Sequence, residues 1–185
     1  MDLDDTPIHY ETLQAPGCLW AFSFPSTPPQ KWIEQSHQRD MDAIEQGLKF
    51  NYKIPTFEGY VLGPNAYEEF AKNLTAQRNS EIAYHGVSYV GECLFEQKRN
   101  LAEFLKRMAS RYKNSKVNTL LINASNDFSE IADILKKFRR LFPFSLKGDF
   151  NKNDCRKGAA LLRSISPFEL SAFASLRTVL DIWKI

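Results

Sequence analysis

The longest helical pattern of the chain lies at residues 80–112, which read SEIAYHGVSYVGECLFEQKRNLAEFLKRMASRY. Its apolar side chains recur at intervals of three and four, the spacing of one face of an α-helix. They are Ala83, Val87, Val90, Leu94, Leu101, Leu105, Met108 and Tyr112. About thirty residues at roughly 1.5 Å each make a rod of about 50 Å. The pattern therefore predicts a long central helix over about 80–112.

Shorter amphipathic patterns flank this helix on both sides. They predict helices over about 26–48, 64–74, 117–142 and from 153 onward, with a kink or break at Ser166. Residues 51–63 read as a connector that is extended at 60–62, and residues 18–24 read as a short aromatic strand. The expected fold is mainly α, with five or six helices around the central one and one N-terminal strand pair at most.

Polar residues and prolines mark where these helices start. Ser26 or Thr27 precedes two prolines and is the expected first cap. Asn153 or Asp154 is expected to cap the helix that follows the 144–152 loop. At 166–169 the sequence is Ser-Pro-Phe-Glu, which predicts a serine cap, proline at the first position and a glutamate that completes a capping box.

Length and composition predict one helical domain over 1–185, with an irregular or extended segment at 1–25 and a helical body at 26–185. An aromatic content of 13% supplies large apolar groups for a core. No stretch is apolar enough to cross a bilayer, and the N-terminal residues 1–5 are acidic, unlike a secretory signal. We expect a soluble cytoplasmic protein that does not contact a membrane.

The formal net charge of +2 hides an asymmetry between the two halves of the chain. Residues 1–97 carry 14 acids and 6 bases, a balance of −8, whereas residues 98–185 carry 8 acids and 18 bases, a balance of +10. Such a split either closes within the molecule or leaves a basic surface for an anionic partner. We favour closure, because the bases occupy helical positions opposite the apolar stripes.

Four segments resemble a known family. They are Gly63-Pro-Asn-Ala-Tyr-Glu-Glu-Phe-Ala-Lys-Asn-Leu74, Glu96-Gln-Lys-Arg-Asn-Leu-Ala-Glu-Phe-Leu105, Ile131-Ala-Asp-Ile-Leu-Lys-Lys-Phe138 with Leu141-Phe-Pro143, and Ala159-Ala-Leu-Leu-Arg163. Their succession resembles the helical C-terminal half of uncharacterised bacterial proteins similar to butirosin biosynthesis protein H. The aromatic segment at 19–24 is similar to the last strand of that pattern.

The resemblance implies structure rather than chemistry. In that family a cysteine in a papain-like N-terminal half does the acyl-transfer or peptidase-like chemistry, and this chain has no segment similar to that half. The resemblance implies structural roles for three positions. Gly63 would end the connector, Ala66 would allow neighbouring backbone to approach closely, and Tyr67 would fill the core with its hydroxyl paired. Pro167 departs from the family, where the final helix is continuous.

A polar strip on the central helix is the candidate ligand site. His85, Tyr89, Glu92, Cys93 and Glu96 share one face, and Tyr67 of the preceding helix is added as a further ligand-binding candidate. Imidazole and carboxylates from successive turns can hold a metal or a polar ligand. His85 and Glu92 are seven residues apart and no second histidine completes the set. We therefore favour a solvated helix edge and expect no metal or cofactor.

The three cysteines support an enzymatic function only as an alternative. Cys18, Cys93 and Cys155 form no CxxC pair, which is typical of reduced thiols. Cys93 and His85 are two helical turns apart, about 12 Å along the axis, too far for a catalytic hydrogen bond. Cys18 would need His9 or His37 brought to it by the fold. A cysteine-dependent acyltransferase or peptidase-like enzyme stays open on these terms.

Nucleic-acid binding is the third alternative. Lys136, Lys137, Arg139 and Arg140 cluster at the end of the 117–142 helix, where the helix dipole already favours bases. A pI near 8.4 is low for a nucleic-acid-binding domain, and no recognition motif is present. We expect weak, sequence-independent binding at most. The favoured prediction is a non-enzymatic module that binds a small molecule or a protein partner through a cleft lined by aromatic residues.

Overall fold

The computed structural model describes residues 36–49, 56–57, 60–76 and 81–184. The chain divides into two compact units, Met1–His37 and Gln38–Ile185. The expected strand at 18–24 and the caps Ser26 and Thr27 lie outside the described residues. The prediction of a single domain over 1–185 therefore stays a prediction.

Six helices and one two-stranded hairpin make up the described residues. They are α2 (Ser36–Leu48), β1 (Thr56–Phe57), β2 (Tyr60–Val61), α3 (Asn65–Ala76), α4 (Glu81–Arg111), α5 (Ser115–Leu141), α6 (Lys152–Arg163) and α7 (Ser166–Trp183). The mainly α prediction is confirmed, as is the long helix expected over 80–112. The extended connector is confirmed at 60–61, where β2 pairs antiparallel with β1. No described helix offers the long apolar stretch that a membrane span requires.

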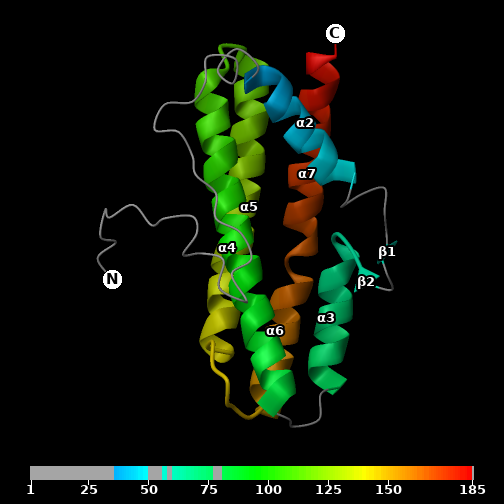
Figure 1. Cartoon of the computed structure of the whole chain (residues 1–185), viewed down its shortest axis with the longest axis vertical. Helices are drawn as coiled ribbons and strands as arrows, with labels where there is room; N and C mark the ends of the chain where they lie inside the picture. Colours follow the sequence, from blue (N-terminus) through cyan, green and yellow to red (C-terminus); the bar gives the residue numbers. More distant parts are fainter. Residues whose placement is uncertain (1–35, 50–55, 58–59, 77–80, 185) are drawn as a thin grey trace, which may run out of the picture. The chain divides into compact units, whose positions relative to one another are not determined.

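The long helices α4 and α5 lie side by side, joined by a short turn (Figure 1). The side chain of Asn114 caps α5 by accepting hydrogen bonds from the backbone N–H groups of Lys116 and Val117 at 3.0 and 3.2 Å. The Asn118 side chain donates to the carbonyl of Ala109 at 2.8 Å, which ties the start of α5 to the end of α4. Because of this cap, α5 begins at Ser115 rather than at the expected position 117.

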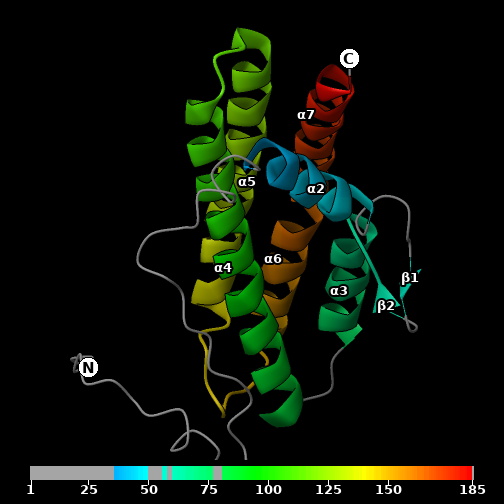
Figure 2. The same cartoon turned by 45° about the horizontal axis from the view of Figure 1, so that its top comes forward.

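The core gathers on α5, which packs against α4, α6 and α7 (Figures 1 and 2). Such a helix must bury apolar groups on more than one face. Its fully buried side chains are Leu121, Ala124, Phe128, Ile131, Leu135 and Phe138. At roughly 1.5–3 kcal/mol for each large apolar side chain, these residues contribute much of the drive for folding. α3 packs mainly on α6.

The two predicted caps of the C-terminal helices are wrong. Asn151, rather than Asn153 or Asp154, caps α6, and its side chain accepts from the backbone N–H of Asn153 at 2.8 Å. Cap position is decided by the backbone, since the capping residue itself must be extended, and Asn151 has φ −87° and ψ 128°.

The break at Ser166 is confirmed, but Ser166 does not cap α7. The residue before the helix is Ile165, which is already in the right-handed helical region and makes no side-chain cap. Ser164 and Ile165, which join α6 to α7, both have right-handed helical backbone, and Ser166 is already the first residue of α7. Ser166 therefore lacks the extended conformation that a capping residue needs. The predicted capping box is therefore not formed, and Glu169 is buried, with 1% of its surface exposed.

Two glycines of α4 give a matched test of helix packing. A methyl group at Gly91 would lie 2.9 Å from the Phe138 ring of α5, whereas one at Gly86 would meet nothing within 4 Å. The helices α4 and α5 thus pack closely at Gly91. We expect Gly86→Ala to stabilise the protein by about 1 kcal/mol through helix propensity.

We expect Gly91→Ala to lose that gain, because overpacking costs about 1–3 kcal/mol. Urea unfolding of the two variants measures the difference directly. Equal stabilisation by both substitutions would show that the α4–α5 contact at Gly91 is not tight.

Candidate functional site

A cavity of about 430 Å³ lies between α3, α4 and the start of α7, closed on one side by the segment after β2. Its lining residues are Val61, Leu62, Gly63, Ala66, Tyr67, Glu69, Phe70, Asn73, Val90, Leu94, Gln97, Lys98 and Glu169. The volume falls within the range of small-molecule pockets, roughly 300–1,000 Å³. It is the candidate functional site.

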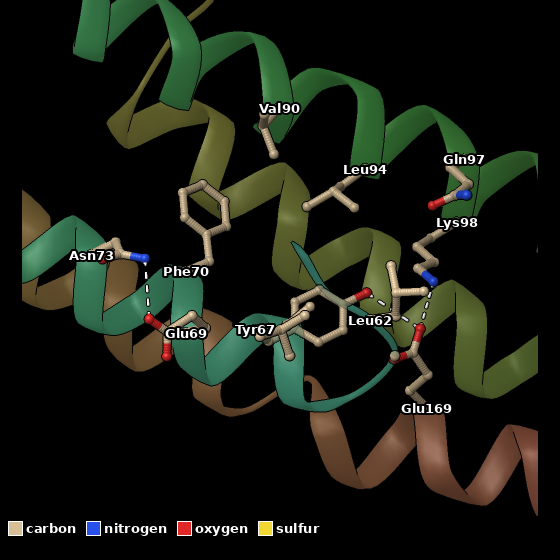
Figure 3. Close-up of a pocket in the computed structure, with 13 residues that line it drawn as sticks. Leu62, Tyr67, Glu69, Phe70, Asn73, Val90, Leu94, Gln97, Lys98 and Glu169 are labelled. Carbon is tan, nitrogen blue, oxygen red and sulfur yellow. Dashed lines mark hydrogen bonds and ion pairs between the residues drawn. The ribbon is translucent and has the colours of Figure 1, made fainter. Parts of the chain in front are cut away.

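One side of the cavity is an apolar wall formed by Phe70, Val90 and Leu94. Leu62 lies instead beside Tyr67 and Glu169 (Figure 3). Figure 3 shows Val90 and Leu94 directed from α4 toward Phe70 of α3. The helical spacing of Val90 predicts a core position, but its side chain is 41% exposed. The reason is that α3 packs on α6 rather than against this part of α4, so this face of α4 borders the cavity.

The other side is a polar end formed by Tyr67, Lys98 and Glu169. Nζ of Lys98 lies 2.5 Å from Oε1 of Glu169, and the Tyr67 hydroxyl donates to the same oxygen at 3.3 Å (Figure 3). The Lys98 and Glu169 side chains are 8% and 1% exposed. Burial of two charges is tolerated only as such a hydrogen-bonded pair, so this interaction fixes both side chains.

Tyr67 stays uncharged at neutral pH. Burial raises the pKa of its hydroxyl well above the ordinary value, and the negative charge of Glu169 and the hydrogen bond to it act in the same direction. The tyrosine therefore acts as a hydrogen-bond donor to the carboxylate. This matches the expected core tyrosine with its hydroxyl paired.

Lys98 and Glu169 were not among the predicted site residues, although the position of each in the sequence carries a signal. Lys98 lies on the apolar stripe of α4, four residues after Leu94 and three before Leu101. Glu169 lies four residues before the buried Phe173 on α7. Two opposite charges at core positions of two helices predict a buried ion pair. Glu169 was interpreted instead as part of a capping box at 166–169.

The polar strip on α4 does not gather around this cavity. Nδ1 of His85 lies 3.2 Å from the carbonyl oxygen of Ser145, and its ring packs near Tyr89 and Phe144. Glu96 pairs with Arg99 one turn away at 2.5 Å. Of the six residues named for the ligand site, only Tyr67 lines the cavity, and the strip itself stays a prediction.

The predicted basic surface is partly neutralised within the molecule. Arg139 pairs with Glu92 of α4, and its guanidinium lies 4.2 Å from the centre of the Phe95 ring. Lys136 borders a smaller groove of about 260 Å³ between α4 and α5, while Lys137 and Arg140 are exposed.

Several ion pairs join the acidic and basic halves of the chain, in line with the favoured closure of charge within the molecule. They are Asp40–Arg111, Glu45–Lys184, Glu68–Arg163 and Glu92–Arg139.

The two described cysteines lie in different surroundings. Cys93 is exposed on α4, and Cys155 is buried in α6. Burial raises the pKa of the Cys155 thiol, with a smaller contribution from Asp154, and so disfavours its reactive thiolate. Cys18 lies outside the described residues. Within the described ranges no three His, Cys, Asp or Glu side chains come together in a way that could hold a metal ion.

Comparisons with protein families, curated proteins and solved structures find no match for this chain. The resemblance to the butirosin biosynthesis protein H family accordingly stays a prediction.

Proposed function

We propose that this chain is a non-enzymatic helical module that binds a small molecule in the cavity between α3, α4 and α7. One observation carries the proposal: an apolar wall faces a buried ion pair across a space large enough for a ligand. Small-molecule sites combine these two features, since apolar surface gives affinity and a few fixed polar groups give orientation. The buried pair keeps the polar end rigid, which lowers the entropic cost of binding.

The described thiols give less support to a cysteine enzyme. Cys93 lies on α4, and it is absent from the cavity lining. The described histidine on the same helix, His85, is directed to the 144–145 loop through its contacts with Ser145 and Phe144. A nucleophile needs a base within about 3 Å, and these contacts do not provide one.

Blocking the cavity tests the proposal. Val90→Trp adds a large ring at the apolar wall, at a position exposed enough to accept it without loss of the core. Asn100→Trp is the matched control, because Asn100 is exposed on the same helix and is not a lining residue. The wild type and both variants are purified from the same cells, and retained small molecules are extracted and identified by mass spectrometry.

We expect a compound that the wild type and Asn100→Trp retain and that Val90→Trp loses. Circular dichroism and thermal unfolding confirm that all three proteins are folded. Equal recovery of every compound from the three proteins would contradict binding in this cavity. Turnover of a thioester or peptide by the wild type, lost on Cys93→Ala or Cys18→Ala, would favour the enzyme alternative instead.

A further inference from the structure

One oxygen of the Glu169 carboxylate lacks a hydrogen-bond donor. Oε1 accepts from both Lys98 and Tyr67, whereas Oε2 is screened from solvent and meets no donor among the described residues. Glu169 is 1% exposed and lines the cavity. A buried carboxylate oxygen without a donor is unfavourable, because nothing offsets the loss of its hydration. A donor group arriving from the cavity would remove this penalty.

We propose that the cavity selects uncharged amphipathic molecules whose polar end carries a hydroxyl or amide N–H group, and that this group donates a hydrogen bond to Oε2 of Glu169. The inference rests on the proposed function, since it names the class of molecule that the same cavity binds. The apolar body of the ligand lies along the apolar wall, and its donor group lies at the polar end.

The charge balance of the polar end disfavours charged ligands. Lys98 and Glu169 neutralise each other, and Tyr67 is an uncharged donor. An ammonium group at Oε2 would also lie near the Lys98 ammonium, and a carboxylate would face the Glu169 carboxylate. Either charged group would add an uncompensated charge to a buried site, where the low dielectric constant strengthens the repulsion between like charges. A hydroxyl or amide group completes the hydrogen bonding and leaves the balance unchanged.

The donor reaches Oε2 only when a lining side chain moves. Leu62 is suited to this movement, because it lies on irregular backbone between β2 and α3 and is only half-buried. The groups of the polar end itself lie on helices α3, α4 and α7. Side-chain rearrangement on a fixed backbone is common on binding.

Four probes with the same eight-carbon chain test the inference. They are octan-1-ol, 1-methoxyoctane, octylammonium and octanoate, titrated into the full chain at pH 7 by isothermal titration calorimetry. The alcohol can donate a hydrogen bond, whereas the ether only accepts and has one more carbon to bury. We expect octan-1-ol to bind roughly tenfold more tightly than each of the other three, the effect of one hydrogen bond to a charged group.

A double variant tests whether Glu169 accepts the hydrogen bond from the ligand hydroxyl. Lys98→Met with Glu169→Gln keeps the pair neutral and places an amide N–H₂ where Oε2 was. The preference of this variant for the alcohol over the ether should fall to within about twofold, since a donor now faces the ligand. Val90→Trp should weaken the binding of every probe.

The outcomes separate the two proposals. Equal binding of alcohol and ether, or tightest binding of a charged probe, with binding still lost in Val90→Trp, would overturn the ligand class and leave the proposed function standing. No binding of any probe to the wild type, or binding that Val90→Trp does not weaken, would overturn both. If the double variant does not fold, the wild-type series decides alone.

Discussion

Replacing Lys98 by methionine is expected to lower the free energy of unfolding by about 3–5 kcal/mol at pH 7, because it leaves the Glu169 carboxylate buried without its counter-ion. The loss is expected to be large because the two side chains are only 8% and 1% exposed, so bulk solvent screens the Glu169 charge only weakly. Urea unfolding with an unchanged slope would assign the loss to the folded state.

Two further variants define the cause of that loss. Lys98→Met combined with Glu169→Gln should recover most of it, because a neutral amide needs no counter-ion and still accepts from Tyr67. Arg107→Met breaks the exposed pair with Glu103, whose side chains are 81% and 61% exposed and 3.9 Å apart. We expect this control to cost about 0.5 kcal/mol or less. A loss no larger in Lys98→Met than in Arg107→Met would mean that the buried pair is not formed in solution.

Phe138→Ala is expected to destabilise the protein by about 3–5 kcal/mol, through lost apolar burial and the cavity left behind. Phe138 is 0% exposed and lies beside Phe70 of α3, Gly91 of α4 and Gly158 of α6. Its ring centre is 4.9 Å from that of Phe142 and 5.7 Å from that of Phe70, and it fills the space beside Gly91. Few neighbours can collapse into the space, because each is held by its own helix.

Phe104→Ala is the matched control for this loss. Phe104 is 39% exposed on α4, so its removal should cost far less, about 1 kcal/mol. Thermal and urea unfolding of the two variants under the same conditions measure the difference. Equal losses would show that the junction around Phe138 is not the centre of the core.

Helix number and position could be predicted from local patterns. The apolar spacing from Val87 to Met108 specifies the length of α4, and Pro167 marks the break before α7. Caps were harder to predict, because Asn151, Asn153 and Asp154 are all suitable residue types and only the backbone selects one. Residue type limits which residues can cap the helix, and the backbone conformation decides which of them does.

The sequence prediction of the site was less complete. Tyr67 was predicted correctly as a paired core tyrosine, but the expected ligand strip at His85, Tyr89, Glu92 and Glu96 lines a different face of α4 from the cavity. Periodicity identifies residues that share a face. It does not say which face borders a cavity, because that depends on where the other helices pack.

The helices of the described residues follow from local patterns, since helix periodicity and the breaks between helices are local properties of the chain. The pairing of Lys98 with Glu169 depends instead on long-range packing, because the two residues are 71 positions apart in the chain and come together through the packing of α5 against both α4 and α7. The same packing leaves the space between α3 and α4 that becomes the cavity. Long-range contacts depend on how whole helix faces fit together, and no local pattern encodes that fit.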